Sequence, residues 1–186
     1  MDTLADYLAP ELHIVSIGLN PSVNSVRAGF YFATPRNRFW RALNDSGLPA
    51  APLEPGPAAQ AVLLERDRIG FTDVVKRPTP GGAQLRAADF RRWAPDLRDR
   101  LLECGARIAW FHGLQAYRAY LRYGEEDPRG ARGELPWGRQ AHRIGASAVF
   151  VSPNPSPANA AYSLRAITQW YARLARWRDR LLGAEA

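Results

Sequence analysis

The chain has 186 residues, of which 46% are hydrophobic, and its 25 basic and 18 acidic side chains give a formal net charge of +7. This length predicts one domain over 1–186, and the charge predicts a basic surface suited to an acidic partner. A single cysteine, Cys104, excludes an internal disulfide and a four-cysteine iron–sulfur cluster, and no apolar run approaches the ~20 residues of a membrane span. Because the first residues lack the pattern of a signal peptide, we expect a cytoplasmic protein with no membrane partner.

Hydrophobic patterning predicts helices and strands that alternate along the chain. A short helix is expected over 3–8, and a β-branched run predicts a buried strand over 12–18. Polar residues and glycines indicate a loop over 19–36, and a helix is expected from Asn37 to a stop at Gly47. The later elements are, in order, a helix over 58–68, an extended segment over 70–75, a helix over 87–104 broken before Pro95, a strand over 107–112, a helix after Gly113, a strand over 148–152 and a helix over 163–182.

This alternation predicts a three-layer α/β/α domain with a mostly parallel central sheet. In such sheets ligands bind beyond the carboxyl ends of the strands, which directs attention to the loops there. The sequence Asn-Pro-Ser follows the first predicted strand at Asn20 and the last one at Asn154. Proline restrains the residue before it to extended backbone, so each asparagine is held in a defined direction. One such step alone is a common turn.

Several dispersed stretches resemble one known family. The residues 18–22 (GLNPS), 29–33 (GFYFA) and 37–40 (NRFW) resemble the first motif of mismatch-specific uracil-DNA glycosylases, the bacterial mismatch and thymine-DNA glycosylase branch of the uracil-DNA glycosylase superfamily. Further stretches agree in order at 70–78, 113–117, 137–140 and 153–156, so the likeness covers roughly Ile14 to Trp177. The resemblance implies the same α/β/α fold. It also implies hydrolysis of the N-glycosidic bond of a deoxyuridine mispaired with guanine in double-stranded DNA, after the nucleotide is flipped out of the helix.

Two residues are candidates for the reaction itself. Asn20 matches the family's asparagine that positions the attacking water, a geometric task because a neutral amide is a poor base; alternatively it caps the turn. Asp73 falls at a position that varies in the family and lies near the base. It would orient or deprotonate the water, or else serve as a strand-end aspartate paired with Lys76 or Arg77.

Three residues are candidates for the base pocket. Phe32 matches the aromatic side chain that stacks on the flipped base, and Leu19 belongs to the same motif. Ser22 stands where this branch often has glycine. Because serine is small, we expect an open pocket in which thymine or ethenocytosine opposite guanine is also a substrate.

The second loop is expected to enter the DNA. Asn154 and Ser156 match the family's second motif, which contacts the widowed guanine and pushes a side chain into the vacated stack. Pro157, Ala158 and Asn159 depart from the glycine-led wedge of close relatives. Ala158 is too small to fill the space of a base, so we expect weak plugging or plugging shared with its neighbours. The alternative is an ordinary proline-rich turn.

Some chemistries are disfavoured by what the sequence contains. Lys76 is the only lysine, so 25 − 1 = 24 of the basic residues are arginine. Strand-cleaving glycosylases form a Schiff base through an amine, and the family precedent is hydrolytic, so we expect a monofunctional enzyme that leaves an abasic site. The three histidines, His13, His112 and His142, show no metal-ligand spacing, and we expect neither a metal nor a cofactor.

Arginines in or beside the motifs are candidates for phosphate contacts, although each is as readily a surface residue or an ion-pair partner: Arg27, Arg36, Arg38, Arg77 and Arg139. The arginines of the last helix are expected on its solvent face. We expect a monomer that associates with the nucleoid through DNA. Other readings stay open: a glycosylase for hypoxanthine or another deaminated base, a DNA-lesion binder without catalysis, and a small-nucleotide-binding protein.

Overall fold

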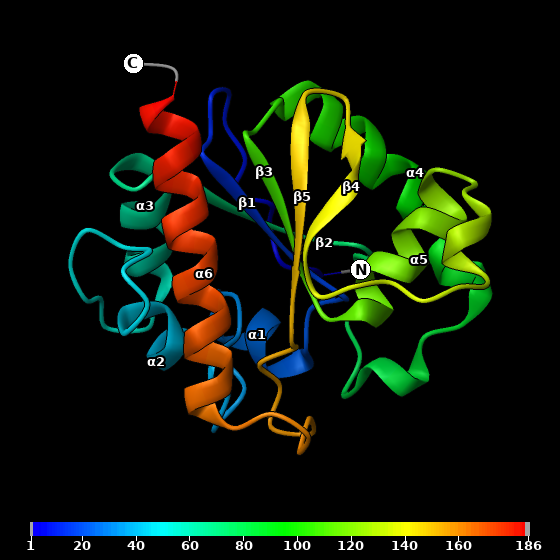
Figure 1. Cartoon of the computed structure of the whole chain (residues 1–186). Helices are drawn as coiled ribbons and strands as arrows, with labels where there is room; N and C mark the ends of the chain where they lie inside the picture. The colour runs from blue at the N-terminus through cyan, green and yellow to red at the C-terminus, as the bar shows by residue number, and fades with distance from the viewer. Residues whose placement is uncertain (1, 185–186) are drawn as a thin grey trace.

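The computed structural model describes residues 2–184 and has a five-stranded sheet between two layers of helices (Figure 1). The strands are β1 (Ile14–Gly18), β2 (Ile69–Asp73), β3 (Ile108–His112), β4 (Gly138–Ile144) and β5 (Ser147–Ser152). Their order is β2-β1-β3-β5-β4, and all neighbours are parallel except β4, which is antiparallel to β5. The predicted α/β fold with a mostly parallel sheet is therefore confirmed.

The helices form two layers with different cores. Their bounds are α1 (Val23–Ala28), α2 (Phe39–Asn44), α3 (Pro57–Glu65), α4 (Ala87–Cys104), α5 (Leu114–Gly124) and α6 (Leu164–Gly183), with short 3-10 turns η1 (Gly82–Gln84) and η2 (Pro128–Gly130). Helices α2, α3 and α6 cover one face over an aromatic core that includes Phe39, Phe71 and Trp110, while α4 and α5 cover the other over a more aliphatic core (Figure 1). Within residues 2–184, no helix is long and apolar enough to span a membrane.

The strands explain where the loops gather. Every residue of β1, β2, β3 and β5 is buried, as expected for parallel strands covered on both faces. Because these four strands run in one direction, the segments that follow them meet at one end of the sheet, at the bottom of Figure 1. The two Asn-Pro-Ser loops belong to this group.

The predicted helix over 3–8 is wrong. Tyr7 instead forms an antiparallel bridge with Phe71 through two backbone hydrogen bonds of 2.9 Å. Six residues are too few for a stable isolated helix, whereas the outer edge of β2 offers unpaired backbone groups. The N-terminal segment therefore covers the sheet edge.

The predicted break before Pro95 and the uninterrupted loop over 19–36 are also wrong. Helix α4 continues through Pro95, an exposed residue beside the buried Ala94 and Leu97 that anchor the helix. The loop contains α1, whose N-cap is Ser22 and whose C-cap is Gly29 at φ 75°. Strand β4 was not predicted; its alternation of exposed and half-buried residues is typical of an edge strand.

Candidate active site

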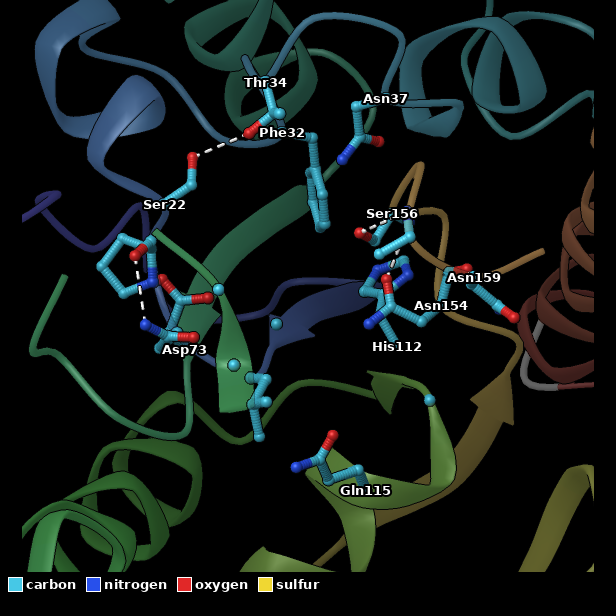
Figure 2. A pocket seen from close by; sticks show the side chains of 18 of the residues that line it. Ser22, Phe32, Thr34, Asn37, Asp73, His112, Gln115, Asn154, Ser156 and Asn159 are labelled. Atoms are coloured by element: carbon cyan, nitrogen blue, oxygen red, sulfur yellow. Dashed lines mark hydrogen bonds between the residues drawn. The ribbon is translucent and has the colours of Figure 1, made fainter. Parts of the chain in front are cut away.

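A cavity of about 560 Å³ lies at the carboxyl end of the sheet. Nine of the ten predicted site residues line it; the exception is Pro157, which is exposed on the adjoining loop. Figure 2 shows Asp73 on one side of this space, Asn154 and Asn159 on the other, and Phe32 between them. The two motifs, far apart in the sequence, thus enclose one cavity.

Asn20 follows β1, and its amide has a fixed orientation. Its Nδ2 donates to the backbone oxygens of Arg77 at 3.0 Å and Pro21 at 3.2 Å, and to Thr79 Oγ1 at 2.7 Å. The Thr79 hydroxyl donates its own proton to the Gly81 oxygen at 2.9 Å, so toward Asn20 it is an acceptor. The amide nitrogen therefore braces the loop, as the turn interpretation expected, while Oδ1 is the end left to bind a ligand.

Asp73 ends β2 and is 2% exposed. It stands opposite Gly18 in the β1–β2 register, where a Cβ atom would lie 2.3 Å from Asp73 Oδ1, so the first motif requires a glycine there. Its Oδ2 is buried and has no hydrogen-bond partner among the described residues. Burial raises the pKa of Asp73 to about 7, against the opposing effect of nearby Lys76.

The ion pairs considered for Asp73 are absent from the described structure. Lys76 pairs instead with Asp6, with 2.6 Å between Nζ and Oδ1. Arg77 binds the two carboxylate oxygens of Asp89 at 2.7 Å each. Asp73 is therefore a buried carboxyl group that lines the cavity, and neither of these cations pairs with it directly.

Phe32 is held in an unusual conformation. Its φ of 60° lies in the left-handed region, which costs a non-glycine residue about 1 kcal/mol. One ring face stacks on Phe39 at 4.0 Å between centroids and 14° between planes, and the ring also meets the edge of His112 at 5.0 Å. Because Phe39 covers one face, the opposite face is the one available to a flat ligand in the cavity.

Ser22 has a local structural task. Its hydroxyl accepts from the backbone N–H of Ser25 at 3.0 Å as the N-cap of α1, and it accepts from the Thr34 hydroxyl at 2.9 Å (Figure 2). The hydroxyl is therefore committed to holding α1 at the cavity wall. Leu19 lines the same wall, and its backbone oxygen accepts from Val75 N–H at 3.0 Å.

The loop at 154–159 is organised by Arg38. The Arg38 guanidinium donates to the backbone oxygens of Pro155 at 3.2 Å and Asn159 at 2.9 Å, and also to those of Ser156 and Tyr162. Within the loop, Asn159 Nδ2 donates to the Asn154 oxygen at 2.8 Å. Ala158 and Pro157 lie exposed at its tip.

His112 is a cavity residue for which the sequence analysis proposed no role. It ends β3, is 2% exposed, and lies 2.8 Å from Ser16 Oγ through Nε2 and 3.3 Å from the Tyr171 hydroxyl through Nδ1. Burial lowers the pKa of His112 to about 3, so the imidazole is neutral. The strand-end rule that singled out Asn20 would have found it. Among residues 2–184 no group of three His, Cys, Asp or Glu side chains is placed to hold a metal ion.

Comparison with known proteins identifies the family. The sequence model of the Uracil DNA glycosylase superfamily matches residues 5–177, nearly the whole chain. The chain belongs to this superfamily. A structure solved by solution NMR, from Methanosarcina acetivorans and provisionally named a uracil DNA glycosylase, has a TM-score of 0.60 and 21% sequence identity. The match covers 94% of this chain and 96% of that one, so the two share a fold.

Membership in the uracil DNA glycosylase superfamily supports DNA glycosylase activity and DNA as the partner. It also gives a context for the arginines. Arg38 and Arg77 are engaged within the protein, and for Arg77 this is the ion-pair alternative, with Asp89 as the partner. Arg27 and Arg36 are exposed on the segment between β1 and α2 and remain candidates for phosphate contacts.

Two further predictions concern Arg139 and the arginines of α6. Arg139 is exposed on β4, and its guanidinium lies 5.8 Å from the Trp177 ring centroid. Four of the five arginines of α6 are exposed as expected, but the side chain of Arg178 is 13% exposed and donates to the Leu48 backbone oxygen at 2.6 Å. These contacts tie the edge strand and the loop after α2 to the C-terminal helix.

Proposed function

We propose that the protein is a monofunctional DNA glycosylase that hydrolyses the N-glycosidic bond of uracil in G·U mismatches of double-stranded DNA and leaves an abasic site. One observation carries the proposal: Asn20, whose amide has a fixed orientation, and Asp73, a buried carboxylate whose Oδ2 has no hydrogen-bond partner within residues 2–184, line the same cavity. This combination suits the activation of a water molecule.

The reaction needs a water oxygen with a free lone pair facing C1′ of the deoxyribose. A water that donates its hydrogens to Asn20 Oδ1 and to the Asp73 carboxylate is oriented in that way. As the C1′–N1 bond breaks, uracil leaves as an anion, the water oxygen bonds to C1′, and the water proton passes to Asp73. A carboxyl group with a pKa of about 7 suits this task because a base titrating near neutral pH is both ionised and proton-accepting.

The base would be held against Phe32. A mismatched base is flipped out of the helix at lower cost, and its flat face stacks on the ring face opposite Phe39. Ser22 leaves room beside the base, so thymine and ethenocytosine opposite guanine are proposed as further substrates. On the DNA side, the exposed tip at Pro157 and Ala158 would enter the stack, with Asn159 at its base.

The environment of Lys76 supports hydrolysis over strand cleavage. Schiff-base formation requires a neutral, accessible amine. The Lys76 side chain is 8% exposed, its ammonium is paired with Asp6 at 2.6 Å, and it donates to the Tyr31 hydroxyl at 3.3 Å. A paired and buried ammonium has neither the lone pair nor the access that a nucleophile needs.

Single-turnover excision assays test the proposal. Duplexes carrying uracil, thymine, ethenocytosine or hypoxanthine opposite guanine, uracil opposite adenine, and single-stranded uracil DNA would be compared. We expect fastest release of free uracil from G·U, strand cleavage only after alkali, and no borohydride-trapped complex. Asn20→Ala should be slower by about 10²–10³-fold, whereas Asn24→Ala, an exposed asparagine on α1, should match the wild type. Absence of uracil release from every substrate would contradict the activity, and a trapped complex would contradict the hydrolytic mechanism.

A further inference from the structure

A cluster of buried and half-buried polar and charged groups lies beside Asp73 at the outer edge of β2. Its centre is the Asp6 carboxylate, brought there by the bridge between Tyr7 and Phe71. Lys76 Nζ lies 2.6 Å from Asp6 Oδ1, and the Arg100 guanidinium donates to Asp6 Oδ2. Thr72 joins the cluster: its hydroxyl donates to Asp6 at 2.8 Å and accepts from Arg100 at 2.7 Å. One carboxylate therefore faces two cations.

The charges of this cluster balance only when Asp73 is included. Asp6 contributes one negative charge and Lys76 and Arg100 one positive charge each, which leaves a net charge of +1. Three buried side-chain atoms in the described part of the chain lack a hydrogen-bond partner; two of them are Arg100 Nη2 and Asp73 Oδ2, and the third is His142 Nδ1. Of the first two, one atom belongs to a cation and the other to a carboxyl group that is negative when ionised. Both cations, Lys76 and Arg100, interact electrostatically with Asp73. Because unbalanced buried charge is costly, an ionised Asp73 completes a neutral group of four.

The other ionisable groups near Asp73 do not supply this balance. The Tyr31 hydroxyl accepts from Lys76 at 3.3 Å, and its pKa is raised by burial and by the two aspartates, so it stays protonated. His112, across the cavity at the end of β3, is neutral because burial lowers its pKa. The groups that determine the charge of Asp73 are thus those of the cluster: Asp6 on the N-terminal segment, Lys76 after β2 and Arg100 on α4.

We propose that the Asp6–Lys76–Arg100 cluster holds Asp73 as a carboxylate near neutral pH and so sets the pH below which base excision fails. The inference rests on the proposed function, because it assigns positioning residues to the water-activating carboxylate. Lys76 and Arg100 favour the charged form of Asp73, while burial and Asp6 oppose it. The only lysine of the chain would thus act through the field it exerts on Asp73.

Two substitutions that break the same ion pair separate this role from a structural one. Lys76→Met removes a positive charge, so it should raise the pKa of Asp73 and move the acid limb of the pH–rate profile to higher pH. Asp6→Asn removes a negative charge and should move that limb to lower pH. Each shift should be about one pH unit. Loss of packing or of the ion pair would affect both variants alike, whereas the electrostatic role predicts opposite directions.

The experiment is single-turnover excision of uracil from a G·U duplex at a saturating concentration of folded enzyme between pH 5 and 9. Lys76→Arg should keep the wild-type profile. Arg98→Met, which removes a cation from the same helix but one paired with Glu125 at 3.2 Å, should leave the profile unshifted. Asp73→Asn should excise uracil slowly, and its pH–rate profile should have no acid limb. Shifts in the same direction for Lys76→Met and Asp6→Asn, or no shift in either, would overturn the inference.

A second readout keeps the inference testable if Lys76→Met does not fold. The carboxyl ¹³C resonance of Asp73 can be titrated by NMR in the free wild-type protein and in Asp6→Asn, with Asp73→Asn used to assign the signal. A lower pKa of Asp73 in Asp6→Asn supports the inference, and an unchanged or higher one overturns it. Because this titration needs no substrate, it distinguishes failure of the inference from failure of the proposed glycosylase activity, which would show as no uracil release by the wild type.

Discussion

The two Asn-Pro-Ser loops lie at the same end of the sheet but are held very differently. The loop after β1 is fixed to the segment after β2 by backbone hydrogen bonds from Val74 to Gly18 at 2.9 Å, from Val75 to Leu19 at 3.0 Å and from Thr79 to Pro21 at 3.2 Å. Within residues 2–184, the loop after β5 has one backbone hydrogen bond to another segment, from Arg38 N–H to the Pro155 oxygen at 3.1 Å. Its carbonyl groups converge on the side chain of Arg38, and its tip is exposed.

This difference indicates a division of labour. A reacting water must be positioned within a fraction of an ångström, which a loop tied to the sheet can do. A segment that enters DNA needs exposed groups and a conformation stable enough to avoid ordering costs on binding. We therefore expect changes at the first loop to alter the rate of the chemical step, and changes at the second loop to alter affinity for DNA.

The largest effect is expected from removing both of the groups that we propose bind the attacking water. Asn20→Ala and Asp73→Asn should each slow single-turnover excision by about 10²–10³-fold, and the double variant by at least about 10⁴-fold. Asn20→Ala alone should retain measurable excision because Asp73 still binds the water. A double variant no slower than Asn20→Ala would show that Asp73 has no part in the reaction.

A smaller effect, on affinity, is expected from Arg38→Met. This change removes the charged donor that holds the carbonyl groups of Pro155 and Asn159, so the loop would have to be ordered on binding. The Kd for a G·U duplex, measured by fluorescence anisotropy, should rise by about 10–100-fold. Arg41→Met, which removes an exposed cation from α2, is the matched control and should change the Kd little. Equal Kd changes in the two variants would mean that Arg38 acts only through its charge.

The smallest effect is expected at Thr79, which fixes the amide of Asn20 through its hydroxyl at 2.7 Å. Thr79→Val keeps the shape but removes that acceptor, so the amide loses one of the contacts that keep Oδ1 toward the cavity. We expect excision to slow by about tenfold with an unchanged Kd. Thr79→Ser, which restores the hydroxyl, should recover the rate. A Thr79→Val variant with the wild-type rate would show that the other two acceptors suffice.

Much of this comparison could be predicted from the sequence. The β-branched runs identified the core strands, and the strand-end rule placed Asn20 and Asn154 at one end of the sheet. Strand β4 escaped prediction because its exposed and half-buried residues, among them Arg139 and His142, do not form an apolar run. Helix α1 escaped because its six residues carry capping signals, Ser22 and Gly29, rather than an apolar stripe.

The environment of the site residues could not be predicted, because it depends on contacts between distant segments. The sequence places Lys76 and Arg77 close to Asp73, so an ion pair was one of the two alternatives for Asp73. In the fold, Lys76 pairs with Asp6, which is 70 residues away in the sequence, and Arg77 pairs with Asp89. Arg38 likewise lies 117 residues before Pro155, whose backbone oxygen it binds. Nothing in the sequence near Arg38 therefore indicates that it supports the second motif.

We thus expect the loop after β1 to control the chemical step and the loop after β5 to control binding of DNA. Single-turnover release of uracil from a G·U duplex, measured across enzyme concentrations, gives both the maximal rate and the half-saturating concentration in one experiment. We predict that Asn20→Ala lowers the maximal rate with little change in the half-saturating concentration, and that Arg38→Met raises the half-saturating concentration with little change in the maximal rate. A change in the same parameter in both variants, or no uracil release by the wild-type protein, would contradict it.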